Sequence, residues 1–309
     1  MKFERKYDYN ENYFEKIDTP EKAYCLGFWY ADGYIEVKPN HVISITQADI
    51  QKDILEKIAK EFGSNKPIYE RKPEKGKLFY TLQFNGPKLT SDLIKLGCTP
   101  NKSLTLQFPT SSIVPNNLLS HFIRGYFDGD GCIWNGKRKK MKVKDTTRQE
   151  GYRERIVHNV KFTFTGNVTF INALQDYLVA IGIVNKKTKL NFSKAKNKNN
   201  STCEQVCTME YSGRKQIKNL YDYMYRESTI HCDLKKLKFE EIFCASEEKS
   251  SEDTSLIAGT PEMVISSEAS NVEERSSTIP EMGVEPSGSK CEAPNLKEKG
   301  EDIVSSAIK

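Results

Sequence analysis

The 309-residue chain has a modest net charge of +5, eight cysteines and no long apolar run. The cysteines lack both the density of a disulfide scaffold and the paired spacing of a zinc ribbon, while the polar N-terminus and the short apolar run near residues 24–31 suit neither a signal peptide nor a membrane span. We therefore expect an intracellular protein of the cytoplasm, the nucleoid or an organelle, rather than a secreted or membrane protein.

Hydrophobic periodicity predicts alternating helices and strands in a first half, residues 1–112. Thr19 and Pro20 are typical of a helix start and Gly33 of a helix end, so a helix is expected over residues 20–32. The other predicted elements are a strand over residues 42–46, an amphipathic helix over 49–61 with Ile50, Ile54, Leu55 and Ile58 on its apolar face, a strand over 78–84 and a helix over 91–96.

Residues 113–244 repeat the same order of elements as a second half. The patterns predict a helix over residues 115–130, a strand over 160–165, a helix over 168–181, a strand over 204–211 and a helix over 214–225. The repeat is also visible in the letters, because GFWYADG (residues 27–33) is followed 98 residues later by GYFDGDG (residues 125–131). We interpret the two halves as a duplication.

The last part of the chain, residues 245–309, differs sharply in composition. It holds 14 acidic and 6 basic side chains and no aromatic residue, whereas residues 1–244 hold 41 basic and 28 acidic side chains and all 32 aromatic residues. An acidic Ser/Glu-rich segment buries too little apolar surface to offset its ordering entropy, so we predict a disordered tail. The basic, aromatic-rich remainder is typical of a nucleic-acid-binding protein.

Small residues recur at a spacing of four in the paired helices. Gly27 and Ala31 lie in the first helix, and Gly125 and Gly129 in the second. Such a stripe lets another backbone approach closely, and the natural partner of each helix is the other copy. We therefore predict that the two helices pack against each other about a pseudo-twofold axis.

This packing would bring the carboxylates of Asp32 and Asp130 together. Each lies at a helix C-terminus, where the macrodipole already disfavours negative charge, so the pair requires a cation. Mg²⁺ prefers oxygen ligands and retains waters and substrate phosphates, and Mn²⁺ is a substitute. The pattern thus predicts metal-assisted hydrolysis of phosphodiesters.

The two segments CLGFWYADG (residues 25–33) and IRGYFDGDG (residues 123–131) resemble the signature helix of the LAGLIDADG, or DOD-type, homing endonucleases. The resemblance extends over nearly all of residues 20–240. Asp32 and Asp130 match the metal-binding acids of the family. Tyr30 stands where the pattern has its earlier acid, so Asp128 has no counterpart in the first copy.

The resemblance implies an α+β fold in which two αββαββα halves form a monomer, with two four-stranded antiparallel sheets making a DNA-binding saddle. It also implies a site-specific, metal-dependent nuclease that cuts both strands of double-stranded DNA across the minor groove of a long recognition site. Such proteins serve intron homing as mobile elements. An alternative on the same fold is an intron RNA maturase, a non-cleaving DNA-binding regulator or an inactive relative.

The resemblance further implies one assisting basic residue near the end of each half. Lys102 lies in the matching segment of the first half, and Lys235, or else its neighbour Lys236, in that of the second. An ammonium group there would stabilise charge developing on the phosphate. The family often has a glutamine on a strand beside the metals, and Ser44 and Thr163 occupy those positions, with hydroxyls too small to indicate more than a weak role.

A basic run follows the second signature helix, in an insertion before residue 160. We predict an extended hairpin on the DNA side. Contacts to phosphates are expected from Lys137, Arg138, Lys139, Lys140, Lys142 and Lys144. Contacts to guanine edges in the major groove are expected from Arg148, Arg153 and Arg155.

Overall fold

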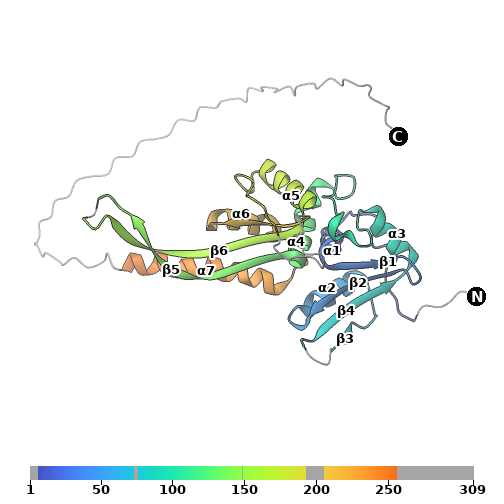
Figure 1. Ribbon diagram of the computed structural model, residues 1–309. Coiled ribbons are helices and arrows are strands. Elements are labelled where there is room, and N and C mark those ends of the chain that lie inside the picture. The colour runs from blue at the N-terminus through green and yellow to red at the C-terminus, as the bar shows by residue number, and fades with distance from the viewer. Residues whose placement is uncertain (1–5, 73–75, 148, 193–204, 256–309) are drawn as a thin grey trace, which may run out of the picture. The chain divides into compact units, whose positions relative to one another are not determined.

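Two four-stranded antiparallel sheets, each with helices packed on one face, form the computed structural model (Figure 1), which describes residues 6–72, 76–147, 149–192 and 205–255. The first half contains α1 (Pro20–Asp32), β1 (Gly33–Glu36), β2 (Val42–Ala48), α2 (Lys52–Glu61), β3 (Tyr69–Arg71), β4 (Phe79–Asn85) and α3 (Pro87–Lys95). The second half contains α4 (Leu119–Asp130), β5 (Gly131–Lys144), β6 (Tyr152–Asn167), α5 (Val168–Ala180), β7 (Asn191–Phe192), β8 (Val206–Ser212), α6 (Arg214–Tyr225) and α7 (Asp233–Ser255).

The two sheets share one topology. Their strand orders are β1-β2-β4-β3 and β5-β6-β8-β7, and the registers agree because Gly33 pairs with Ile45 and Gly131 with Phe164. In each half the signature helix therefore ends on its aspartate, and the next residue begins the edge strand. The predicted duplicated α+β fold is confirmed.

The signature helices α1 and α4 lie side by side between the two sheets (Figure 1). The Thr19 hydroxyl accepts a hydrogen bond from the Lys22 amide and caps α1, while Pro20 occupies the first helical position. Residues 23–30 of α1 and 121–128 of α4 are all buried. Burial on every side is expected of helices that pack on each other and on two sheets.

Close contact between these helices depends on Gly27 and Gly125. A Cβ on Gly27 would overlap the Phe122 carbonyl and lie 2.9 Å from the Tyr126 amide nitrogen. A Cβ on Gly125 would meet the backbone of Tyr24 and Phe28 in the same way. The reciprocal contacts make the crossing point a backbone-to-backbone approach that only glycine permits.

The helices on each sheet cover an apolar face. Phe62 stacks on Phe84 at a ring-centroid distance of 4.6 Å in the first half, and Phe127 on Phe162 at 4.7 Å in the second. In α2, Ile54, Leu55 and Ile58 are buried as predicted. The prediction for Ile50 is wrong: this side chain is 69% exposed, because residues 49–51 form a 3₁₀ turn that directs it away from the sheet.

Some element bounds also differ from the sequence-based ones. Helix α3 begins at Pro87 rather than at residue 91, because Gly86 adopts an extended conformation and lets proline occupy the first turn. The predicted start of α4 at residue 115 is a 3₁₀ turn over Asn116–Leu118. The edge strands β3 and β7 are short, which explains their weak sequence signal.

The predicted hairpin after the second signature helix is formed by β5 and β6. Pairing continues outward from the sheet to Lys144 opposite Tyr152, with a register shift between Asn135 and Arg138. Helix α7 contacts β5 (Figure 1). The hairpin distinguishes the two halves, since the corresponding β1 of the first half has only 4 residues.

Helix α7 continues to Ser255, past the predicted tail boundary at residue 244. The rest of the predicted tail, residues 256–309, lies outside the described residues, so its disorder stays a prediction. None of the helices in the described ranges combines the length and apolar composition required to cross a membrane.

Candidate active site

The carboxylates of Asp32 and Asp130 lie at the adjoining C-terminal ends of α1 and α4. A Cβ on Gly129 would contact Ala31 Cβ and lie 3.2 Å from Asp32 Oδ2, so the small-residue stripes reach as far as the carboxylates. The structure thus brings together the four stripe residues and both acids of the sequence prediction.

The environment of Asp130 favours its neutral form. Although the side chain is solvent-exposed, the surrounding protein removes much of its hydration, and this burial, together with the negative charge of Asp32, raises the pKa of Asp130 to about 6. Burial also raises the pKa of Asp32, while the hydrogen bond from Gln47 and the charges of Lys235 and Lys102 oppose that shift. Two adjacent carboxylates of this kind favour a cation between them.

Gln47 is a site residue that the sequence interpretation missed. Its Nε2 donates to Asp32 Oδ2 at 2.6 Å from near the end of β2. Ser44 and Thr163 were the expected polar strand residues, but Ser44 pairs in the ladder opposite Tyr34, and the Thr163 hydroxyl donates to the Cys132 carbonyl at 3.5 Å. The signal that could have identified Gln47 is strand alternation, because it follows Ile43 and Ile45 at a spacing of two on the buried face of β2.

The two halves differ at this position. Gly166 occupies the position in the second half that is equivalent to Gln47 in the first. A cavity of about 200 Å³ lies beside Gly166, and its lining includes Asp130, Lys102 and Tyr126. The Tyr126 hydroxyl donates to the Thr165 carbonyl at 2.8 Å and fills part of the space. Asp130 therefore faces an open pocket where Asp32 faces an amide.

Lys102 lies against the end of α1. Its side chain is only 7% exposed, and its Nζ donates to the carbonyls of Ala31 at 3.1 Å and Gly33 at 2.7 Å. A cation at a helix C-terminus satisfies carbonyls that lack helical partners and complements the macrodipole. Its burial contrasts with the solvated position that is usual for lysine.

Lys235 repeats this arrangement at the end of α4. Its side chain is 9% exposed, and its Nζ donates to the carbonyls of Phe127 at 2.7 Å, Asp128 at 2.6 Å and Gly129 at 2.9 Å. All three N–H donors of this ammonium are thereby used. Lys236, the other candidate, is half-buried, and within the described residues its ammonium donates to no carbonyl of α4.

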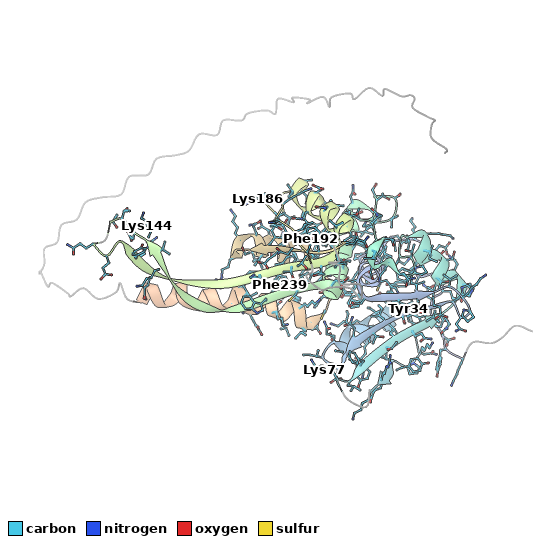
Figure 2. All side chains as sticks on the ribbon, viewed as in Figure 1. Tyr34, Lys77, Lys144, Lys186, Phe192 and Phe239 are labelled. Carbon is cyan, nitrogen blue, oxygen red and sulfur yellow. The ribbon has the colours of Figure 1, made fainter. Side chains whose placement is uncertain are left out.

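The open faces of the two sheets carry matched polar pairs. Thr46 and Thr81 hydrogen-bond across β2 and β4 at 2.9 Å, and Thr165 and Thr208 do so across β6 and β8 at the same distance. The large aromatic side chain Trp134 is half-exposed, on the part of β5 that precedes the register shift. Tyr34 is also exposed on β1 (Figure 2).

The described basic side chains near the hairpin tip are exposed. They are Lys142, Lys144 (labelled in Figure 2) and Arg153, whose Nε lies 3.9 Å from Asp145 Oδ2. Arg148 lies outside the described residues. The other predicted DNA-contact residues lie on β5 and β6, and only their backbone is described. These residues are Lys137, Arg138, Lys139, Lys140 and Arg155.

The residues at the helix ends fit a hard divalent ion. In the described part of the chain, three or more His, Cys, Asp or Glu side chains nowhere gather closely enough to share a metal ion, so Asp32 and Asp130 would be its protein carboxylates. Mg²⁺ is commonly bound by one or two carboxylates together with waters and substrate phosphates. The raised pKa values of both acids indicate a need for positive charge.

The family model of the LAGLIDADG-like domain matches residues 19–93 and 117–224, which is more than half of the chain and covers both halves separately. The protein belongs to the LAGLIDADG family. The two matched segments begin just before the signature helices, and the candidate site at the ends of α1 and α4 lies within them, as does Gln47. Lys102 and Lys235 lie outside the matched segments.

Solved structures of other LAGLIDADG proteins are similar to this chain at low identity. I-WcaI, a homing endonuclease bound to its DNA recognition sequence, is 16% identical, covers 74% of this chain and 91% of its own, and has a TM-score of 0.46. I-AabMI, a meganuclease bound to uncleaved DNA, is 15% identical, with coverages of 76% and 92% and a TM-score of 0.44. None of the curated proteins matches the sequence.

Proposed function

We propose that the protein is a site-specific, divalent-metal-dependent endonuclease that acts as a monomer and hydrolyses one phosphodiester bond in each strand of double-stranded DNA, across the minor groove. The observation that supports this most is the meeting of Asp32 and Asp130 at paired helix ends, each end carrying a buried lysine. A module that only binds DNA has no need of two desolvated carboxylates beside two buried ammonium groups.

In this proposal Asp32 and Asp130 hold Mg²⁺, or Mn²⁺ in its place. The ion, when bound, lowers the pKa of a water molecule and neutralises charge on the phosphate. Gln47 fixes the orientation of the Asp32 carboxylate through its hydrogen bond to Oδ2 and favours the ionised form. The pocket beside Asp130 gives water and a phosphate oxygen access to that carboxylate.

The two lysines have different tasks in the proposed reaction. Two donors of the Lys102 ammonium point to carbonyls, and we assign the third to a phosphate oxygen, where the charge that develops during hydrolysis would be stabilised. Lys235 donates all three of its N–H groups to carbonyls at the end of α4. Its positive charge acts at a distance and, like that of Lys102, opposes the rise in the pKa of both Asp32 and Asp130.

Binding to the duplex is proposed for the open faces of the two sheets and for the basic hairpin. Threonine hydroxyls and exposed Tyr34 and Trp134 suit contacts to bases and sugars, while Lys142, Lys144 and the other basic hairpin residues suit phosphates. Homing of an intron or another mobile element would be the biological use, in a compartment that holds DNA.

Cleavage selection on a plasmid library with randomised inserts tests this proposal. Wild-type protein with Mg²⁺ should cut a discrete set of inserts on both strands, and Asp32→Asn or Asp130→Asn should abolish double-strand cleavage while preserving binding to the selected duplex. Asp176→Asn, on the surface of α5, is the matched control and should cut normally. Full cleavage by either site variant would remove these acids from the mechanism.

Two alternatives are distinguished by the same experiment. Selective binding to DNA without cleavage in Mg²⁺ or Mn²⁺ would identify a regulator, and selective binding to intron RNA with faster splicing would identify a maturase. The presence of both acids with their buried lysines favours the nuclease over either alternative.

A further inference from the structure

The second residue before the catalytic aspartate differs between the two repeats. It is Tyr30 in the first and Asp128 in the second, which makes the first copy depart from the signature pattern. Both side chains are nevertheless buried, with exposed fractions of 2% and 1%. The polar group of each is directed at a helix end in its own half.

In the first half, the Tyr30 hydroxyl donates to the Leu96 carbonyl, directly after the last residue of α3. This carbonyl belongs to the group at a helix C-terminus that has no helical partner. From there the chain turns at Gly97, which has a φ of +90°, and reaches Lys102 six residues after Leu96. Tyr30 thus fixes the start of the segment that carries Lys102.

In the second half, Asp128 Oδ2 accepts a hydrogen bond from the Cys232 amide at 2.7 Å, directly before α7. The same oxygen accepts from the Tyr24 hydroxyl at 2.8 Å, and Oδ1 accepts from the Tyr225 hydroxyl at 2.6 Å. A carboxylate suits the amides at a helix N-terminus, just as a hydroxyl suits a carbonyl at a C-terminus. Lys235 follows Cys232 within one helical turn.

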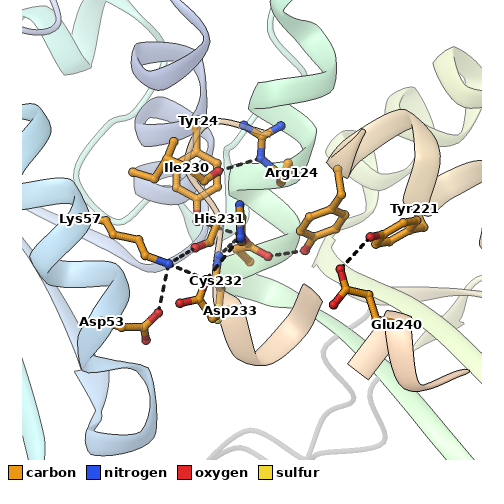
Figure 3. Close-up of polar contacts among 12 residues, drawn as sticks. Tyr24, Asp53, Lys57, Arg124, Tyr221, Ile230, His231, Cys232, Asp233 and Glu240 are labelled. Atoms are coloured by element: carbon orange, nitrogen blue, oxygen red, sulfur yellow. Dashed lines mark hydrogen bonds and ion pairs between the residues drawn. The ribbon is translucent and has the colours of Figure 1, made fainter. Parts of the chain in front are cut away.

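The start of α7 is also held by α2 of the first half and by α4 (Figure 3). Lys57 of α2 donates from Nζ to the His231 carbonyl at 3.0 Å and to Asp233 Oδ1 at 2.6 Å. The Arg124 Nε of α4 donates to the Ile230 carbonyl at 2.9 Å. Among these contacts only that of Asp128 links the signature helix directly to the amide that leads into the Lys235 turn.

We propose that Tyr30 and Asp128 are positioning residues, each of which fixes the helix end from which the chain delivers the lysine of its half to the catalytic carboxylates. The inference rests on the proposed function, and it assigns equivalent tasks to side chains with opposite hydrogen-bond polarity. Tyr30 donates to a carbonyl and Asp128 accepts from an amide. The first repeat departs from the signature pattern at Tyr30, which contacts a carbonyl where Asp128 contacts an amide. The positioning role is the same in both repeats.

Strand-resolved single-turnover cleavage tests the proposal. On a selected duplex labelled differently on each strand, Lys102→Ala and Lys235→Ala first define which strand each lysine serves. Tyr30→Phe should then slow the Lys102 strand on the order of tenfold to a hundredfold, the effect typical of partners that orient site residues, with DNA affinity unchanged. Asp128→Asn should slow the Lys235 strand to a similar extent.

Double variants give the decisive comparison. Tyr30→Phe should add nothing to Lys102→Ala on that strand, because Tyr30 acts on the reaction only through the position of Lys102. Tyr13→Phe is the matched control, since it deletes another buried hydroxyl, which contacts Cys25 of α1 at 3.4 Å. The control should leave both strand rates unchanged. Equal slowing of both strands by Tyr30→Phe, or additive effects in the double variant, would overturn the proposal.

Hydrogen exchange supplies a readout that does not need cleavage. Tyr30→Phe should accelerate exchange in residues 96–103 and leave 229–236 unchanged, while Asp128→Asn should do the reverse. If Asp128→Asn fails to fold, Tyr30→Phe still decides the question. If wild-type protein does not cut DNA, the proposed function fails, and unchanged exchange in both segments would separately overturn the positioning roles.

Discussion

Asp130 combines two properties that rarely coexist, exposure to solvent and a pKa raised to about 6. Burial by the surrounding protein is the larger cause and the charge of Asp32 the smaller. Since the proposed metal site requires the ionised carboxylate, the protonation state of this single residue sets the acid limit of the reaction.

The rate of single-turnover cleavage should therefore fall as the pH is lowered through about 6. Calorimetric titration with Ca²⁺ at each pH provides a measurement without turnover, and metal affinity should fall over the same range. Gln47→Leu should raise the pKa of the neighbouring Asp32, because the hydrogen bond from Gln47 opposes its protonation, and should thereby weaken metal binding further at low pH. An acid limb centred near pH 4 would contradict the assignment.

The raised pKa of Asp130 also predicts how folding stability depends on pH, and this dependence runs opposite to that of the cleavage rate. The folded-state pKa of Asp130 lies above its ordinary value of 3.8, so protonation stabilises the folded, metal-free protein. That contribution is complete below about pH 4 and is lost as the pH rises through 6. At pH 7.5, Asp130→Asn should raise the melting temperature of the metal-free protein, and a lower melting temperature would show that the carboxylate is well solvated.

Prediction from sequence succeeded at the residue scale where spacing alone carries the information. Gly27, Ala31 and Asp32 share a helix with fixed geometry, so their letters already predict a helix contact that ends in a carboxylate. Gln47 was missed because its position beside Asp32 depends on the register between β1 and β2, which places Gly33 opposite Ile45. The burial of Lys102 was likewise not evident, since a lysine-containing loop looks solvated until the helix end that it covers is known.

The crossing of α1 and α4 is the element-scale feature on which both halves depend. Backbone atoms already occupy the space that a side chain at Gly27 would need. Gly27→Ala should therefore destabilise the protein by roughly 1–3 kcal/mol, the usual cost of overpacking a close interface. Thermal unfolding of the metal-free protein measures the change.

The control for this substitution is Gly86→Ala. A Cβ there would meet only the Glu11 carboxylate at 3.3 Å, the far end of a flexible side chain, and the φ of 172° is open to any residue. Its melting temperature should stay close to that of the wild type. Equal losses in the two variants would show that the α1–α4 crossing tolerates a wider separation.

The hairpin of β5 and β6 is the second element with a testable role. Replacing Lys137, Arg138, Lys139 and Lys140 with Ala should weaken binding to target and random duplexes alike, because phosphate contacts carry little sequence information. Each lost contact should reduce the slope of log K against log salt by roughly 0.9. Cleavage at saturating protein should persist, since the hairpin holds none of the proposed metal ligands.

Lys215→Ala combined with Lys218→Ala is the matched control for charge. Both side chains are exposed on α6, on the helix-covered side of the second sheet, and their loss should leave the salt slope unchanged. A loss of affinity confined to the target in the hairpin variant would mean that these side chains read bases.

At the scale of the whole molecule, the repeated sequence segments were sufficient to predict two halves, the order of their elements and the packing of their signature helices. Helix α7 was not predicted, because Phe239 and Ile242 are buried but no apolar period continues beyond them. Its position instead depends on contacts from Asp128 and Lys57 that lie over 100 residues away. Such contacts leave no local signal in the segment that they hold.

Deleting residues 256–309 should leave the melting transition nearly unchanged. The described core ends at Ile242, and the deleted segment contains no aromatic residue. The shortened protein should also bind and cut the selected duplex as the full chain does. Aggregation of the shortened protein, or loss of its cooperative transition, would show that the segment contributes to the fold.

The paired extension of β5 and β6 adds a length that can be expressed in base pairs. Beyond the register shift, seven residues of β5, from Arg138 to Lys144, pair with β6. At a rise of about 3.3 Å per residue they span about 23 Å, or roughly seven base pairs of a duplex with a rise of 3.4 Å. If the hairpin follows the duplex axis, the footprint is lopsided, with the longer arm on the side of the second half, and hydroxyl-radical footprinting would measure the difference.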